Sequence, residues 1–267
     1  MIERWLHTGR GARVRVLEGG PADGPPLVFL HGLVGLLDDT PPGFLDHLAE
    51  RYRVYAPELP GYGDSHGEQL LEDMLDFSLH GWDVLDGLGL NSPRRPALVG
   101  HSIGGMIAAE MTCLAPGAIA KLVLVDPFGL WLDEHPIPDF FAFLPFEFGD
   151  YLFDDARRAT ELLAGATQLA DPESLRQFFI ANARRLGTAG KILFPIPNRR
   201  LSKRLYRLTT ETLVVWAEHD RLIPPVYAQH WQALLPHAQV KCLPGAGHML
   251  PYEQPRALAA EVLAFLG

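Results

Sequence analysis

The sequence has few cysteines, no excess of positive charge and no long hydrophobic run. Its 267 residues include two cysteines, Cys113 and Cys242, which we expect to be small core residues and not a disulfide framework. The formal net charge of −9 argues against nucleic acid or an anionic membrane surface as a partner. No stretch approaches the roughly 18 consecutive apolar residues that span a bilayer.

The N-terminal residues also lack the apolar block of a secretory signal. Charged residues, among them Glu3, Arg4 and Arg10, interrupt residues 1–14, so we expect no signal peptide and a cytoplasmic protein. With 48% hydrophobic and 21% charged residues, the chain is expected to form a packed core. We expect a small-molecule substrate and no metal or cofactor. The sequence makes no prediction about the oligomeric state.

Strands and helices are expected to alternate along most of the chain. Short apolar runs that suit strands buried on both faces alternate with segments of helical periodicity. This rhythm is typical of an α/β fold with a mostly parallel central sheet flanked by helices, whose sites lie beyond the carboxyl ends of the strands. The expected strands are 13–17, 27–30, 53–56, 97–100, 121–125, 212–216 and 239–243, and the expected helices are 44–52, 70–88, 106–114 and 255–266.

The alternation breaks between residues 127 and 207, where no strand signal stands out. We expect an inserted helical cap there, on an α/β core made of residues 1–126 and 208–267. Most of its aromatic side chains are expected to form a small core between cap helices, while a few face the site. The aromatic residues at its start are Phe128, Trp131, Phe140, Phe141, Phe143, Phe146, Phe148, Tyr151 and Phe153.

Two helices and a basic run are expected inside this segment. Residues 155–166 have helical periodicity. Asp171 as N-cap and Pro172 at the first helical position open a second helix, which Gly187 is expected to end. The basic run after it is expected to be a solvated helix face. It consists of Arg199, Arg200, Lys203, Arg204 and Arg207.

One short stretch, Gly100 to Gly104, has the G-x-S-x-G spacing of a nucleophile elbow around Ser102. A strand that turns directly into a helix crowds its corner residue, and glycines two positions before and after relieve that crowding. The N–H of Ile103 then lies at a helix N-terminus, where backbone donors lack internal partners and favour an anion. The alternative interpretation is an ordinary glycine-rich turn between a strand and a helix.

The sequence resembles the α/β-hydrolases, in their serine hydrolase branch with a helical cap. The resemblance extends from about residue 27 to the C-terminus, with the cap unmatched in detail. It rests on His31-Gly32, on the turn 59–65, on the elbow, and on Asp220 and His248 after late strands. A departure is Ala217, where related sequences often have glycine.

The resemblance implies a Ser–Asp–His set in the chain order of that fold. Ser102 is then the nucleophile, His248 the general base and Asp220 the acid that orients the imidazole. Asp126, at the end of the strand before the cap, is the competing acid, because some members of the family place it there. The implied oxyanion hole consists of the backbone N–H groups of Leu33 and Ile103.

Other residues near these turns are expected to shape the site. His101 and His31 are expected to shape their turns, and His219 to point away from the catalytic histidine. The residues expected around the substrate pocket are His31, Phe128, Trp131, Phe140, Phe141, Phe143 and Met249, with Leu33 as a wall. Because Glu147 is the only charged residue between Phe140 and Gly149, uncharged substrates with apolar groups are expected.

The serine at the elbow narrows the reaction class. Epoxide hydrolases and haloalkane dehalogenases of this fold use an aspartate there, so acyl transfer to water remains. A carboxylesterase is favoured. The alternatives are a thioesterase, a lactonase, a perhydrolase, a C–C bond hydrolase of ring-fission products, and a small-molecule receptor without turnover. The C–C hydrolases usually carry a glycine-rich stretch where this chain has residues 33–37, which disfavours that alternative.

Overall fold

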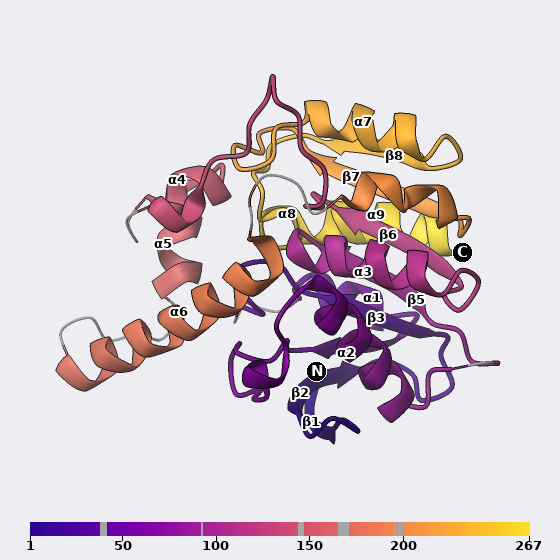
Figure 1. Cartoon of the computed structure of the whole chain (residues 1–267), viewed down its shortest axis with the longest axis horizontal. Helices are drawn as coiled ribbons and strands as arrows, with labels where there is room; N and C mark the ends of the chain where they lie inside the picture. The colour runs from indigo at the N-terminus through magenta and orange to yellow at the C-terminus, as the bar shows by residue number, and fades with distance from the viewer. Residues whose placement is uncertain (38–41, 92, 144–146, 165–170, 195, 197–199) are drawn as a thin grey trace.

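The fold is built on one mostly parallel sheet. The computed structural model describes residues 1–37, 42–91, 93–143, 147–164, 171–194, 196 and 200–267. Eight strands follow the order β1-β2-β4-β3-β5-β6-β7-β8 (Figure 1), parallel from β4 to β8, with β2 antiparallel to both β1 and β4. The strands are β1 (Ile2–His7), β2 (Arg13–Gly19), β3 (Pro26–Leu30), β4 (Arg53–Pro57), β5 (Ala97–His101), β6 (Lys121–Val125), β7 (Thr212–Ala217) and β8 (Gln239–Leu243).

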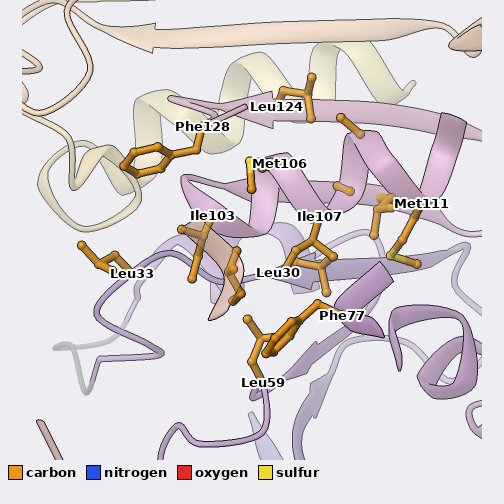
Figure 2. Packing of buried hydrophobic residues seen from close by; sticks show 14 of the residues in the cluster. Leu30, Leu33, Leu59, Phe77, Ile103, Met106, Ile107, Met111, Leu124 and Phe128 are labelled. Atoms are coloured by element: carbon orange, nitrogen blue, oxygen red, sulfur yellow. The ribbon is translucent and has the colours of Figure 1, made fainter. Parts of the chain in front are cut away.

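Helices cover both faces of this sheet. Successive strand residues point to opposite faces, so in β5 Leu98 belongs to one core cluster and Val99 to the other. The first cluster joins the sheet to α2, α3 and α7, and Figure 2 shows it around Ile107 and Phe77. The second joins the sheet to α1, α8 and α9. These helices are α1 (Phe44–Ala49), α2 (Met74–Gly87), α3 (Ile103–Leu114), α7 (Val226–Leu234), α8 (Leu250–Glu253) and α9 (Pro255–Leu266).

The segment 127–207, called the cap segment below, contains helices and no strand among its described residues. Its helices α4 (Phe148–Leu152), α5 (Ala156–Ala164) and α6 (Pro172–Leu193) lie together to one side of the sheet (Figure 1). The Asp171 side chain accepts a hydrogen bond of 2.8 Å from the N–H of Ser174, which confirms it as the N-cap of α6.

Several boundaries differ from the expectation. Gly187 does not end α6, because buried residues of the following turns, among them Ala189 and Ile192, pack on the core and carry the helix past the glycine. The helix expected from residue 70 begins at Met74, because the Asp73 side chain caps it. Strand β1 and helix α7 were not expected.

One further expectation is wrong, and another is confirmed in part. Cys242 is exposed, because it lies on the edge strand β8. The basic run is solvated at Arg200, Lys203 and Arg207, as expected. It forms two short 3-10 turns at 201–203 and 205–207 instead of one helix face, and its Arg204 pairs with Glu110 on α3. The expected residues Phe146, Arg199 and 165–166 lie outside the described residues. Among the described helices, none is both long and apolar enough to cross a membrane.

Candidate active site

Ser102 occupies the turn between β5 and α3 that the elbow spacing predicts. Its backbone has φ 58° and ψ −121°, a conformation that is strained for a residue other than glycine. A Cβ on Gly104 would lie 2.2 Å from the carbonyl oxygen of Leu30, and one on Gly100 would lie 2.4 Å from that of Gly104. The two glycines therefore permit a close approach of backbone that no side chain would allow.

His248 connects Ser102 to Asp220. Its Nε2 lies 2.8 Å from the Ser102 hydroxyl oxygen, and its Nδ1 lies 2.7 Å from a carboxylate oxygen of Asp220. The other oxygen of Asp220 accepts hydrogen bonds of 2.9 Å from the N–H of Leu222 and 2.8 Å from that of Ile223. When Nδ1 donates to the carboxylate, Nε2 is left as an acceptor for the serine proton.

Asp126, the competing acid, has different surroundings. It is fully buried at the end of β6 with φ 43°, and one carboxyl oxygen accepts a hydrogen bond of 2.8 Å from the N–H of Ala217. Its other oxygen, Oδ2, has no hydrogen-bond partner among the described residues. Burial, followed by repulsion from Asp220, raises the pKa of Asp126 well above its usual range. No hydrogen bond joins Asp126 to His248 in the described part of the chain, so the geometry favours Asp220.

Two backbone N–H groups belong to residues near the serine, one to Ile103, which follows it, and one to Leu33. A Cβ on Gly32 would lie 3.0 Å from the Cβ of Ser102, so the turn that carries Leu33 passes directly beside the serine. The N–H groups of Leu33 and Ile103 are buried and donate no hydrogen bond to any described residue. Buried N–H groups are rarely left without a partner, and these two are therefore available to a substrate oxygen.

Both turn histidines are buried and held neutral. His31 accepts a hydrogen bond of 2.9 Å at Nε2 from the N–H of Leu59, and its Nδ1 lies 2.8 Å from the carbonyl oxygen of Gly32. His101 Nε2 lies 2.7 Å from the carbonyl oxygen of His248. Burial lowers the pKa of His31 to about 4 and that of His101 to about 3. Both rings brace the backbone of the site.

The aromatic residues expected in the pocket pack largely against one another. The ring centroids of Phe140 and Phe141 lie 4.1 Å apart, and those of Phe141 and Phe194 lie 4.7 Å apart. Phe143 stacks on Tyr151 at 4.2 Å. Most of this cluster is thus an aromatic core of the cap segment.

Three other expected pocket residues have distinct positions. The ring of Phe128 lies 6.2 Å from that of His248, and Figure 2 shows Phe128 and Leu33 near the end of α3 that carries Ile103. Met249 is buried, and its N–H donates to the carbonyl oxygen of Leu152 at 2.9 Å. Trp131 is half-buried and donates to Asp133. His219 points away from His248 and lies 3.0 Å from a carboxylate oxygen of Asp154.

A small cavity next to Leu33 contains residues that were not expected. Its volume is about 40 Å³. Among the described residues, the only charged side chain that lines it is Arg185 of α6, and the only other polar one is Asn182. The charged run 184–185 sits in an amphipathic helix, and nothing in the sequence separates it from a solvated helix face. The lining consists of Leu33, Val34, Phe148, Leu163, Phe178, Asn182, Arg185 and Leu186.

The geometry can be compared with known proteins. A model of the alpha/beta hydrolase family matches residues 27–261. The chain belongs to this family. No group of three or more His, Cys, Asp or Glu residues is placed to hold a metal ion within the described ranges.

Relatives of this alpha/beta hydrolase have varied names. A dihydrolipoyllysine-residue acetyltransferase component of an acetoin cleaving system from Pseudomonas putida is 30% identical, over 96% of this chain and 67% of that protein. Carboxylesterase YbfK of Bacillus subtilis is 26% identical, over 99% of this chain and 88% of its own. Other relatives are named as a lipase and as hydrolases of hydroxy-oxo-dienoate compounds. The esterase, lipase and dienoate hydrolase names among them support a hydrolase.

The fold is also found in solved structures. A membrane phospholipase A, described as a bacterial virulence factor, superposes with a TM-score of 0.80 at 24% identity, over 99% of this chain and 85% of that one. At this identity the similarity shows the fold. It therefore supports the α/β-hydrolase architecture and leaves the substrate open.

Proposed function

We propose that this chain is a serine hydrolase that cleaves an ester bond of a small, mainly apolar substrate through an acyl-enzyme intermediate. The observation that carries the proposal is the continuous chain of short contacts from Ser102 through His248 to Asp220. A hydroxyl is a weak nucleophile at its ordinary pKa and needs an adjacent base, which His248 supplies. A carboxylesterase is the most direct form of this chemistry.

Each step follows from atoms already in position. Ser102 Oγ attacks the ester carbonyl carbon while its proton moves to His248 Nε2, and Asp220 stabilises the imidazolium. The carbonyl oxygen becomes an oxyanion that accepts hydrogen bonds from the N–H groups of Leu33 and Ile103. Collapse breaks the ester bond, and the leaving alkoxide takes the proton from Nε2. Water, deprotonated by His248, then releases the acid from Ser102.

The preference for apolar groups rests on the lining of the cavity next to Leu33, one of the two proposed oxyanion donors. Leu33, Phe148, Phe178 and Leu186 supply an apolar wall to the cavity there. The cytoplasmic location expected from the N-terminal residues stays a prediction.

The test is steady-state turnover of a substrate panel by the wild type and Ser102→Ala. The panel contains p-nitrophenyl butyrate, an acyl thioester, a lactone, a perhydrolysis assay and a ring-fission dienone. We expect many turnovers of the ester and the highest kcat/KM for it. Ser102→Ala should fold normally and lose nearly all turnover.

Other results would change the proposal in defined ways. A higher kcat/KM for the thioester, lactone or dienone would move the chain to that class of hydrolase. Binding without repeated turnover of any panel member would indicate a receptor. Wild-type activity in a folded Ser102→Ala variant would remove Ser102 as the nucleophile.

A further inference from the structure

The guanidinium of Arg185 is a positive charge without a negative partner beside the proposed oxyanion site. It donates a hydrogen bond of 3.0 Å to the carbonyl oxygen of Val34 and a second one to the side chain of Asn182. No carboxylate among the described residues pairs with it. The neighbouring residue Arg184 does have a negative partner, because it forms an ion pair of 3.0 Å with Glu68.

Arg185 is held in this place by the packing of α6 on the core. Thr188 packs against the backbone of Gly61, where an added Cβ would lie 2.0 Å from the Thr188 hydroxyl oxygen. Lys191 Nζ donates to the carbonyl oxygens of Glu68 and Leu71 at 2.7 Å and 2.9 Å. The guanidinium is therefore positioned before any ligand arrives, which lowers the entropy lost on binding.

The surroundings make this half-buried charge costly to hold without a negative partner. Burial lowers the pKa of Arg185, and the groups that interact with it electrostatically are the buried rings of Tyr62 and His31. Tyr62 is 2% exposed, and its hydroxyl has no hydrogen-bond partner among the described residues. A charge that is partly removed from water is normally paired, and a positioned arginine is well suited to bind a carboxylate through charge-assisted hydrogen bonds.

The location relates this charge to the reacting carbonyl. Leu33 and Val34 are consecutive, so the guanidinium bound to the Val34 oxygen lies within about 10 Å of the Leu33 N–H, from backbone dimensions. Leu33 lines the cavity that contains Arg185, whereas Ser102, Ile103 and the turn 247–249 do not. Because the leaving group must face His248 Nε2, we assign this cavity on the Leu33 side to the acyl group. The cavity of about 40 Å³ has room for a group the size of a carboxylate.

We propose that Arg185 binds a carboxylate at the far end of the substrate's acyl group, so that the enzyme prefers esters of ω-carboxy acids. This inference deepens the proposed ester hydrolysis and rests on it for its kinetic readout. With this inference, a substrate with a carboxylate at one end takes the place of the uncharged substrate that was expected from the phenylalanine-rich stretch of the cap segment. The apolar wall of the cavity accommodates the methylenes between the two ends.

The experiment compares mono-p-nitrophenyl adipate with its neutral amide, p-nitrophenyl adipamate. We expect the wild type to show a kcat/KM at least tenfold higher for the adipate, the order of magnitude for a charge-assisted hydrogen bond. Arg185→Met, which keeps an apolar stem, should bring the ratio to about one. Arg184→Met is the matched control on the same helix and should leave the ratio unchanged.

Two further measurements keep the inference falsifiable. Arg185→Lys retains the charge and should keep a ratio of at least threefold, which decides the matter if Arg185→Met does not fold. Calorimetric binding of adipic acid monoanilide and its amide to Ser102→Ala requires no turnover. We expect Ser102→Ala to bind the monoanilide, which carries the carboxylate, at least tenfold more tightly than the amide. Arg185→Lys, added to Ser102→Ala, should keep part of that difference.

The results separate this inference from the proposed function. If neither ester is hydrolysed, the proposed function fails, and the binding difference alone supports or overturns the role of Arg185. If the wild type hydrolyses both esters at equal kcat/KM, the proposed function stands and the role of Arg185 is wrong. Equal loss for both esters in Arg185→Met and Arg185→Lys would show a purely structural arginine and also overturn it.

Discussion

His101 Nε2 lies 2.7 Å from the carbonyl oxygen of His248, so the residue before the proposed nucleophile holds the turn that carries the proposed base. The two rings lie 5.2 Å apart. Because the His101 ring is fully buried and neutral, its Nε2–H is a fixed donor to this turn. The strand-to-helix turn and the turn after β8 are thereby joined directly.

The buried histidines predict how stability depends on pH. The folded-state pKa of His101, about 3, lies below the unfolded value of about 6.5, so stability is full above pH 6.5 and is lost as pH falls toward 3. Between pH 7.5 and pH 5, this histidine alone should cost about 2 kcal/mol of unfolding free energy. Urea unfolding of His101→Gln should therefore show a weaker decline over this range than the wild type.

Exposed His237 provides the control for that measurement. His237→Gln removes an imidazole from the surface and so controls for the loss of a histidine as such. An equal decline in His101→Gln and the wild type would mean that the His101 pKa is not depressed in the folded protein.

The two carboxylates near β7 predict unequal effects of amide substitution. In Asp220→Asn, the amide N–H₂ faces His248 Nδ1 and favours the tautomer with the proton on Nε2, which cannot accept from Ser102. We expect kcat to fall by about 10⁴-fold, as for comparable triads. The comparison is made on p-nitrophenyl butyrate, with folding checked by circular dichroism.

Asp126→Asn is the matched substitution at the other position. Burial raises the pKa of Asp126 well above its usual range and so favours the uncharged acid, which a neutral amide resembles in shape and charge. We expect kcat to change by less than about threefold, the scale of an isosteric neutral replacement. The reverse ranking of the two variants would assign the acid to Asp126.

Two glycines predict opposite effects of an added methyl group. Gly104→Ala would place Cβ 2.2 Å from the carbonyl oxygen of Leu30, and we expect unfolding free energy to drop by several kcal/mol, of which about 1–3 is typical of overpacking alone. Gly187→Ala lies inside α6 with nothing within 4 Å, so it should raise stability by about 0.5–1 kcal/mol. Urea unfolding measures both, and a stable Gly104→Ala would contradict the close approach at the elbow.

Glu253 predicts a link between the cap segment and the histidine turn. Its carboxylate accepts from the N–H of Gly247 at 2.8 Å, and from those of Asp154 and Asp155 at 2.8 Å and 3.1 Å. Glu253→Ala leaves these donors unpaired and should cost about 1–3 kcal/mol of stability. We expect kcat for p-nitrophenyl butyrate to fall more than KM rises, because the turn before His248 loosens.

Exposed Glu50 on the surface beside α1 is the control for that variant. Glu50→Ala should change neither kcat nor the midpoint of unfolding. Unchanged kcat in Glu253→Ala would show that this carboxylate does not help to position the histidine turn.

Local patterns determined the α/β core. Runs such as 121–125 are apolar at every position but the first. This pattern is typical of a strand covered on both faces, and the same residues form β6. The spacing of Gly100, Ser102 and Gly104 also predicted the elbow, because the crowding that requires glycine there arises between residues close in sequence or on the adjacent strand. These features depend on short-range sterics and on the two-residue period of a strand.

Tertiary structure decided what local patterns could not. Glycine ends many helices, and Gly187 was therefore expected to end α6. Packing of the following turns on the core instead extends α6 to Leu193. The distance between Asp220 and His248 depends on how β7 and β8 lie side by side, and the sequence left Asp126 as an alternative. Arg185 looks like any surface arginine in sequence. Only the docking of α6 beside Val34 leaves its charge half-buried and without an acid among the described residues, since that depends on contacts between residues about 150 positions apart.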